Sequence, residues 1–205
     1  MSVSIRYTKG FLLDFKRRLE FIRDAHQLLE MKRDQLIRKL KALVEELKPL
    51  REKVEKEIEE LYGELALFHV VYGTQELRTA SIIGESMEVE VLPKSVIGIS
   101  VPLITKIKVP EVKEKYPPHI ASLAEKMASA INDLIKLAEI ETSIENLAED
   151  LQRTNVRVNA LEKAVIPQYE SLIKRIQDAL DHEMLEEFMR VKLVKNVLIK
   201  KRGEV

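Results

Sequence analysis

Residues 12–54 read LLDFKRRLEFIRDAHQLLEMKRDQLIRKLKALVEELKPLREKV, and apolar residues in this stretch fall alternately three and four positions apart. This spacing is the 3.5-residue period of a left-handed coiled coil. The seam positions are Leu12, Phe15, Leu19, Ile22, Leu29, Leu36, Leu40, Leu43, Leu47, Leu50 and Val54, interrupted by His26 and Arg33. We therefore expect a long helix that buries one stripe against a partner helix.

The pattern extends beyond residue 54 and returns in a second stretch. It continues through Ile58, Leu61, Leu65, Phe68 and Tyr72, and two successive steps of four around Val54 form a stutter that relaxes the supercoil locally. The second stretch, about residues 118–200, has its seam at Ile140, Ile144, Leu147, Leu151, Thr154, Val158, Leu161, Val165, Tyr169, Leu172, Ile176 and Leu180. Because only a short segment separates the stretches, we expect one antiparallel two-helix coiled coil with arms of roughly 100 Å.

The segment between the arms has strand character. SMEVEVLP and LITKIKVP alternate polar and apolar residues, and Pro93, Pro102 and Pro110 bound the runs, which predicts two or three short strands in a β-hairpin. The expected fold class is dominated by α-helix. We expect an N-terminal arm over residues 1–77, a hairpin head over residues 78–117 and a C-terminal arm over residues 118–205, in one continuous rod. Facing residue numbers should then sum to roughly 195, so that residues 26–37 lie beside residues 157–168.

Two prolines sit inside the arms. Pro49 and Pro167 each lack an N–H donor, and such a proline usually kinks or ends a helix at a cost of about 3 kcal/mol. The seam keeps its phase across both, and no neighbouring cluster of turn residues favours a reversal. We interpret both as kinks; the alternative is a bundle of four shorter helices.

Charges are unevenly distributed along a chain whose formal net charge is zero. Residues 1–41 carry 11 Lys or Arg against 5 Asp or Glu, residues 42–65 carry 4 against 8, and residues 190–205 carry 6 against 1. Antiparallel arms would bring both basic segments to one end, where we expect a partner-binding tip. Its residues would be Lys9, Lys16, Arg17, Arg18, Arg190, Lys192 and Lys195. The alternative for any one cluster is a solvated coiled-coil face.

Composition and motifs argue against enzymatic chemistry. Charged residues make up 33% and aromatic residues 5%, with neither Trp nor Cys, so disulfides and thiolate chemistry are excluded. Phosphate-binding loops, GxSxG and Cys-based metal spacings do not occur, and no apolar run is long enough for a membrane span. His182 and Glu183 begin an HExx pair, but position 186 is Glu186, so a zinc-protease site fails. We expect no catalytic residue, no metal and no cofactor.

The polar residues in the first seam favour structural roles. His26 is expected to be a packed, hydrogen-bonded histidine rather than a metal ligand. Arg33, one heptad further on, is expected to set the register of the helices rather than to act in catalysis.

Four segments carry a family resemblance: TKGFLLDFKRRL (8–19), HQLLEMKRDQLI (26–37), RTNVRVNALEKAVIP (153–167) and LEEFMRVKLVK (185–195). They resemble signature stretches of the D subunit of the V-type and archaeal A-type rotary ATPases, and IGISVP (97–102) resembles the hairpin of that family. The matching residues include His26, Lys32, Arg33, Asp34, Thr154, Asn155, Arg157, Asn159, Glu162 and Pro167. The chain is most similar to the prokaryotic, archaeal type.

The resemblance implies a central rotor shaft without catalytic activity, which transmits torque between the catalytic ring of A and B subunits and a membrane proton or sodium ring. It implies that the terminal end enters the ring of A and B subunits, whereas the other end binds the F subunit and the C subunit that connects to the membrane. It further implies a peripheral position on the cytoplasmic side of the cell membrane, with no insertion into it.

Two other classes of protein have long helices and remain as alternatives. A prefoldin-like coiled-coil chaperone also places β-hairpins between helical arms, but its tips expose apolar residues whereas the tip expected here is basic. A nucleic-acid-binding rod is disfavoured by the zero net charge and the few aromatic residues.

Overall fold

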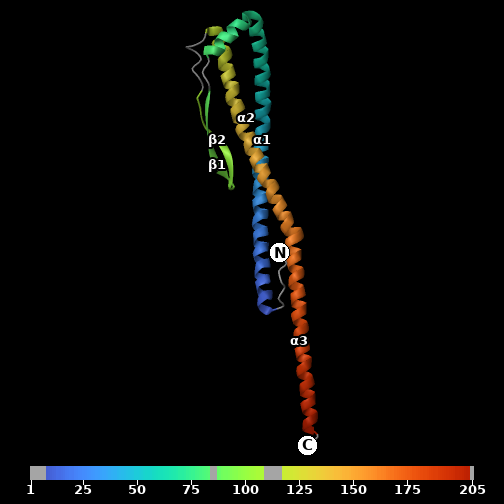
Figure 1. Cartoon of the computed structure of the whole chain (residues 1–205). Coiled ribbons are helices and arrows are strands. Elements are labelled where there is room, and N and C mark those ends of the chain that lie inside the picture. Colours follow the sequence, from blue (N-terminus) through green and yellow to red (C-terminus); the bar gives the residue numbers. More distant parts are fainter. Residues whose placement is uncertain (1–7, 84–86, 109–116, 204–205) are drawn as a thin grey trace. The chain divides into compact units, whose positions relative to one another are not determined.

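The computed structural model describes residues 8–83, 87–108 and 117–203. Its elements are helix α1 (Lys9–Ile83), strands β1 (Glu88–Val96) and β2 (Ile99–Lys108), helix α2 (Pro118–Ala160), a π-helical turn (Leu161–Val165) and helix α3 (Ile166–Gly203) (Figure 1). The predicted fold class, long helices with a small β-hairpin in the middle of the chain, is confirmed. Pro110, predicted to bound a strand, lies outside the described residues.

The chain divides into two compact units, each built on an antiparallel pair of helical segments. The terminal unit combines the start of α1, as far as Met31, with the chain from Thr154 onward. The central unit is Lys32–Arg153 and contains the hairpin.

In the terminal unit, the first turns of α1 pack against α3. Phe15 is buried on α1, and Ile176 and Leu180 are buried on α3. The ring centroids of Phe15 and Tyr169 lie 5.5 Å apart in a stacked arrangement. All four are seam positions of the heptad pattern, so the packing follows the predicted stripe.

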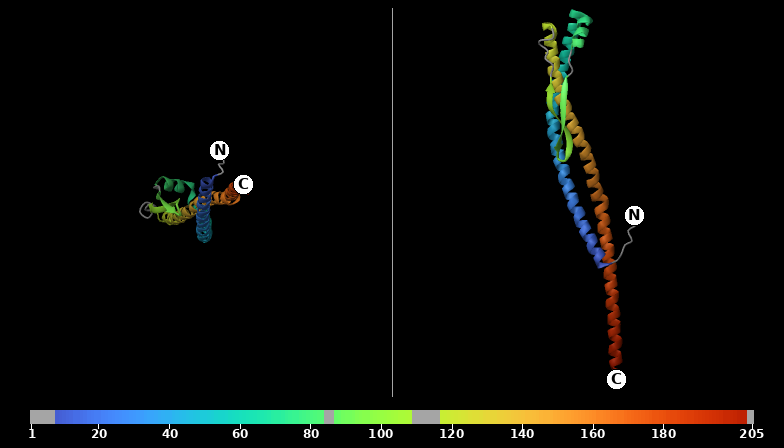
Figure 2. Two further views of the ribbon diagram at one scale, coloured as in Figure 1. Left: turned by 90° about the horizontal axis from the view of Figure 1, so that it is seen from below. Right: turned by 60° about the vertical axis from the view of Figure 1, so that its left-hand side comes forward.

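Helix α3 continues well beyond the start of α1 (Figure 2). Leu180 is the last buried residue among those described, and every residue from Asp181 to Ile199 is exposed. We call Asp181–Gly203 the α3 extension; it is about 35 Å long at the helical rise of about 1.5 Å per residue. Residues 16–18 and 190–195 therefore lie at different heights of this unit. The two basic segments do not meet at one tip, because α1 begins at Lys9, opposite the middle of α3.

A π-helical turn precedes Pro167. A proline at this position offers no N–H to the carbonyl of Lys163, and its ring crowds that oxygen. In the preceding turn, the N–H of Ile166 donates instead to the carbonyl of Leu161, five residues back. The wider turn accommodates one extra residue, so the backbone is helical on both sides of Pro167.

Helix α1 remains helical at Pro49 and is interrupted at Gly73. Gly73 has φ 78° and ψ 173°, a conformation that glycine adopts without the steric cost of a side chain. The ring of Tyr72 stacks on His119 at the start of α2, with centroids 4.6 Å apart. The first arm thus turns at Gly73, whereas the sequence pattern predicts its end near residue 77.

The contacts between facing helices lie at or below the expected sum of about 195. Arg23 donates to Glu170, with Nη2 and Oε1 2.6 Å apart, two residues from the expected position. Arg51 lies three residues from its expected position, beside Glu141. Lys53 pairs with Asp133 and Lys32 pairs with Asp150, nine and thirteen residues closer to the start of α2 than expected, so Lys32 is not beside residues 157–168.

The core of the central unit lies along the α1–α2 seam. Leu36, Val54 and Leu147 are almost completely buried. Next to the turn, Phe68 packs with Ile120 and Leu123, and Leu61, Leu65 and Leu77 lie against this cluster.

The two strands form an antiparallel hairpin with a two-residue turn at Ile97 and Gly98. Both turn residues have positive φ, 54° and 78°, as tight hairpin turns that match the strand twist require. The register shifts between Glu90 and Val91, where the ladder is irregular. Beyond it Pro93 lies opposite Pro102, and neither can donate a backbone hydrogen bond to a further strand.

The hairpin lies alongside the helices of the central unit (Figures 1 and 2). Asn146 in the second half of α2 donates through Nδ2 to the carbonyl oxygen of Ser100, at 3.2 Å. Val101, next to Ser100, is buried. The hairpin therefore folds back beside α2, whereas the sequence predicts a head at the end of the arms.

Candidate interaction surfaces

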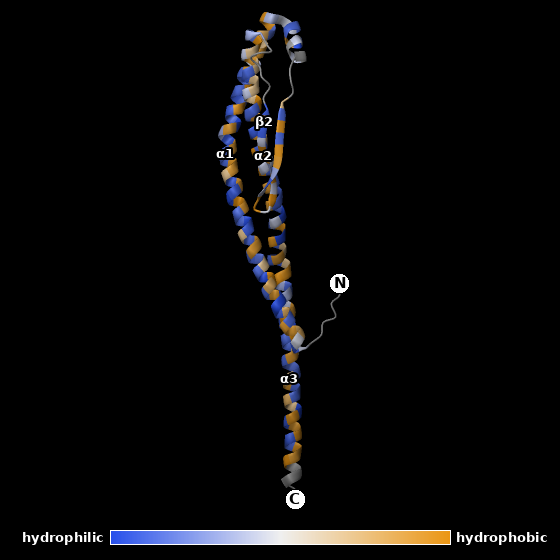
Figure 3. Ribbon diagram, turned by 90° about the vertical axis from the view of Figure 1, so that its left-hand side faces the viewer, coloured by the Kyte–Doolittle hydropathy of each residue, from blue (hydrophilic) through white to orange (hydrophobic). Residues whose placement is uncertain are grey.

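The α3 extension exposes many large apolar side chains. Figure 3 shows hydrophobic residues distributed between hydrophilic ones along this part of α3. They are Met184, Leu185, Phe188, Met189, Val191, Leu193, Val194, Val197, Leu198 and Ile199, all at least 48% exposed. So many exposed apolar residues on one helix indicate a surface that another molecule covers.

Eight of these ten apolar residues form two stripes on roughly opposite sides of the helix. At about 100° per residue, the first stripe continues the seam beyond Leu180; it consists of Met184, Phe188, Val191, Val194 and Leu198. The second stripe is offset by about 160°; it consists of Leu185, Met189 and Leu193. A single partner helix covers only one stripe of about 100°, so the extension presents more apolar surface than one helix can bury.

The basic residues predicted to form a tip lie on exposed helix surfaces in two places. At the start of α1 these are Lys9, Lys16, Arg17 and Arg18, and on the α3 extension they are Arg190, Lys192 and Lys195. The guanidinium carbon of Arg18 lies 5.8 Å from the centroid of the Phe15 ring. Arg190 Nη2 lies 3.4 Å from Glu186 Oε2, one turn earlier.

The family-signature residues of the terminal unit divide into buried and exposed groups. Thr154 is almost fully buried, whereas Arg157, Asn159, Glu162 and Pro167 are exposed and Asn155 is half-buried. The side chain of His26 is 16% exposed, and its Nδ1 lies 3.8 Å from Glu30 Oε2. Its Nε2 is buried without a hydrogen-bond partner among the described atoms. His26 is thus packed as expected, but the hydrogen bonding expected of it is not found at Nε2.

The signature residues of the central unit take part in ion pairs. Lys32 Nζ donates to Asp150 Oδ2 of α2 at 2.7 Å, and Arg33 Nε lies 3.4 Å from Asp34 Oδ1. The first contact joins α1 to α2, beside the apolar seam that packs the two helices together.

The seam predicted for the second arm begins at Ile140. It therefore omits Asp133, a buried carboxylate that lies seven residues earlier. Asp133 is 9% exposed. Lys53 Nζ donates to its Oδ2 at 2.5 Å, and Lys136 Nζ donates to its Oδ1 at 3.2 Å. The hydrogen bonds from the two lysines lower the pKa of Asp133 below its usual value, and the same contact raises the pKa of Lys53. The signal in the sequence is an acidic residue in a seam slot, three residues after Ala130.

This cluster predicts acid sensitivity. Because the pKa of Asp133 is lowered in the folded state, its contribution to stability is present above the unfolded pKa of about 4 and is lost as the pH falls through the folded pKa. Asp133→Asn should therefore flatten the decline of the thermal midpoint between about pH 5 and pH 2. Thermal unfolding across this range measures the effect, with the exposed Glu59→Gln as control. Parallel curves for wild type and Asp133→Asn would contradict it.

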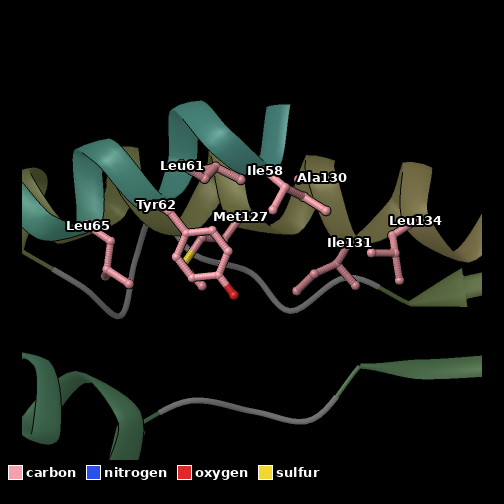
Figure 4. Close-up of a pocket in the computed structure, with 8 residues that line it drawn as sticks. All are labelled: Ile58, Leu61, Tyr62, Leu65, Met127, Ala130, Ile131 and Leu134. Atoms are coloured by element: carbon pink, nitrogen blue, oxygen red, sulfur yellow. The ribbon is translucent and has the colours of Figure 1, made fainter. Parts of the chain in front are cut away.

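An apolar groove lies between α1 and α2 of the central unit. Figure 4 shows its lining residues, which are Ile58, Leu61, Tyr62, Leu65, Met127, Ala130, Ile131 and Leu134. Tyr62 is 69% exposed. The groove is a second surface on which apolar side chains remain open to a partner.

Metal sites and membrane spans are absent from the described part of the chain. Within residues 8–83, 87–108 and 117–203, no three His, Cys, Asp or Glu residues are grouped so that they could hold a metal ion. Across the same residues, no helix is both long and apolar enough to cross a membrane.

Comparison with known proteins identifies the family. Residues 11–196 match the family model of the ATP synthase D subunit. The chain belongs to the ATP synthase D-subunit family. The A-type ATP synthase D subunit of Methanopyrus kandleri is 35% identical over 202 residues, covering 95% of this chain and 87% of the relative. The A-type D subunits of Pyrococcus horikoshii and Thermococcus gammatolerans are 33% and 32% identical, covering 96% and 98% of this chain and 95% and 98% of the relatives. Membership of this family makes the chain one component of a larger complex, which is consistent with the surfaces described above.

Proposed function

We propose that this protein is the central rotor shaft of an A-type rotary ATPase. In this role it transmits torque between a catalytic ring of A and B subunits and a proton- or sodium-translocating ring in the membrane. The shaft itself carries no catalytic residue; the ATP chemistry belongs to the ring of A and B subunits that surrounds it. The match to the D-subunit family over residues 11–196 supports this assignment.

The observation that carries the proposal is the α3 extension. Its two apolar stripes lie on roughly opposite sides of one helix, and both are exposed. A helix that is apolar on more than one side is stable in water only when it is enclosed. A ring of subunits encloses a helix from all sides, whereas a single neighbouring helix does not.

A shaft must also present different faces to chemically identical sites. The terminal unit is an antiparallel pair of unlike helices, with Phe15 of α1 against Tyr169 of α3, and such a pair has no threefold symmetry. Three equivalent catalytic interfaces would each contact a different face of it. Nucleotide binding could then favour one orientation of the shaft over another, because each orientation gives different contact free energies.

The remaining partners in this proposal are the F subunit and the C subunit that connects to the membrane ring. The apolar groove of the central unit supports a contact of this kind, since Tyr62 and Ile131 expose large apolar surfaces there. The complex would hold the shaft at the cytoplasmic face of the cell membrane, as a peripheral component.

Co-purification with the A and B subunits of the same organism tests the proposal. Tagged full-length chain is expected to retain both subunits and to support ATP turnover of the assembled ring. A chain that ends at Leu180 should retain far less of them, although its buried seam is intact. Failure of the full-length chain to retain folded A and B subunits would overturn the shaft assignment. The isolated chain should bind no nucleotide, which equilibrium titration with ATP measures.

The chaperone alternative is not favoured. The exposed apolar residues of the α3 extension remove one argument against it, since chaperone tips also expose such residues. The match to the ATP synthase D subunit over most of the chain decides the question.

A further inference from the structure

One position that faces the partner helix in the central unit is occupied by a carboxylate. Asp133 follows Ala130 by three residues and precedes Leu137 by four, so it fills a slot that a heptad pattern reserves for an apolar side chain. It is the most buried charged residue among those described. Both of its oxygens are engaged, by Lys53 of α1 and by Lys136 of α2.

The other ion pairs that join α1 to α2 in this unit are more exposed. The side chain of Asp133 is 12% exposed, whereas Asp150, the partner of Lys32, is 26% exposed. Glu64, which pairs with Lys126, is 43% exposed. The lysine partners of Asp133 are more than half exposed, Lys53 at 57% and Lys136 at 53%, so only the carboxylate of the cluster is buried. A buried charge that loses its partner is destabilising. Asp133 is therefore the position at which a wrong alignment of the helices is most unfavourable.

The sequence of α1 makes the neighbouring alignments unfavourable in both directions. A slip of one heptad keeps the apolar stripes in contact and is therefore one of the alternative states that a coiled-coil sequence must disfavour. Such a slip moves Asp133 from Lys53 to Glu46 in one direction and to Glu60 in the other. In either alignment Asp133 loses Lys53 and faces a carboxylate of the same charge on α1, and of its two lysine partners only Lys136, on its own helix, remains.

We propose that Asp133 fixes the register of α1 and α2 in the central unit, by attraction to Lys53 in the native alignment and by repulsion from Glu46 and Glu60 in the slipped ones. Asp133 is a positioning residue in this account. The inference goes beyond the proposed function and holds whether or not the protein acts as a shaft. In a shaft it would prevent the two helices from sliding past each other under load.

Introduced cysteine pairs in the full chain can report the register, because the sequence contains no cysteine. Arg51 lies near Glu141, with Nη1 and Oε1 3.8 Å apart, so Arg51→Cys with Glu141→Cys reports the native alignment. Arg51→Cys with Leu134→Cys reports one slipped alignment, and Arg51→Cys with Ala148→Cys reports the other. A short thiol-specific cross-linker is expected to join only the native pair in the otherwise unchanged protein.

Two variants separate this proposal from a simple loss of stability. Asp133→Leu should raise the yield of the slipped pairs at least tenfold while the chain stays helical. Glu60→Lys leaves the contact between Asp133 and Lys53 untouched, yet should raise the yield of the pair with Ala148→Cys, because it makes that slip attractive. Glu59→Lys, with the same change of charge one residue away, should not. The proposal is overturned if neither Asp133→Leu nor Glu60→Lys raises the cross-linking yield of the slipped pairs above its level in the otherwise unchanged protein. It is also overturned if Glu59→Lys raises the yield of the pair with Ala148→Cys as much as Glu60→Lys does.

Discussion

Aspartate on either apolar stripe of the α3 extension is expected to prevent assembly with the catalytic subunits. Phe188→Asp with Val191→Asp alters the first stripe, and Leu185→Asp with Met189→Asp alters the second. Each lost apolar side chain removes about 1.5–3 kcal/mol of favourable free energy of burial. Either pair of substitutions should therefore weaken association by at least about 100-fold. Titration of the labelled chain against the A and B subunits measures the loss.

A polar change at the same height supplies the control. Glu183→Gln should leave the affinity within a few-fold of wild type, because Glu183 lies between the two stripes. All three variants should retain the helix content and thermal midpoint of the parent, since every residue from Asp181 to Ile199 is exposed in the free chain. Unchanged affinity in the Leu185 and Met189 variant would show that only one side of the extension is covered.

The largest effect on stability is expected at Leu36. Its side chain has no exposed surface, and Leu→Ala at such a site typically costs about 2–5 kcal/mol through lost burial and the cavity left behind. This is a large share of a typical folding free energy of about 5–15 kcal/mol. Urea unfolding of Leu36→Ala measures the cost, with Leu28→Ala in the same helix as control.

Leu28 makes a fair comparison because it is the same residue type and is 63% exposed. Leu28→Ala should change the free energy of unfolding by less than about 0.5 kcal/mol. If the two variants were destabilised equally, the seam assignment of Leu36 would be incorrect.

The heptad pattern predicts the helices well because burial along a coiled coil depends on local periodicity. Leu36, Val54, Leu147, Val158 and Ile176 are all assigned to the seam from their spacing, and each is almost completely buried. The alternation around residues 86–109 likewise locates the two strands. The sequence does not indicate that Ile97 is a residue of the hairpin turn, because an isoleucine with positive φ is uncommon.

Backbone geometry is harder to predict than periodicity. Gly73 directly follows Tyr72, the last seam residue named in the first arm, but its φ of 78° and the turn that it produces are not visible in the spacing. Pro167 is expected to disturb its helix, but the form of the disturbance, a π-helical turn, depends on which carbonyl the N–H of Ile166 reaches. Neither feature follows from the distribution of apolar residues.

The candidate site is predicted less well, because it depends on how segments far apart in the sequence are placed. The basic residues near Lys16 and Arg190 would meet at one tip only if the two arms were equal in length, but α3 extends far beyond α1. The apolar character of the extension is present in the sequence, yet its exposure follows only from the absence of any segment of α1 beside it. Asp133 escapes a search for apolar seam residues because it is acidic.

Photo-cross-linking at Val191 in the assembled complex tests the shaft assignment most directly. A benzophenone amino acid at this position, on the first apolar stripe, should cross-link to A or B subunits on irradiation. If the chain is a rotating shaft, ATP turnover should fall in proportion to the cross-linked fraction, because each covalent bond stops rotation. Full turnover in complexes that are quantitatively cross-linked would contradict the account, since it would show that the chain need not move within the ring.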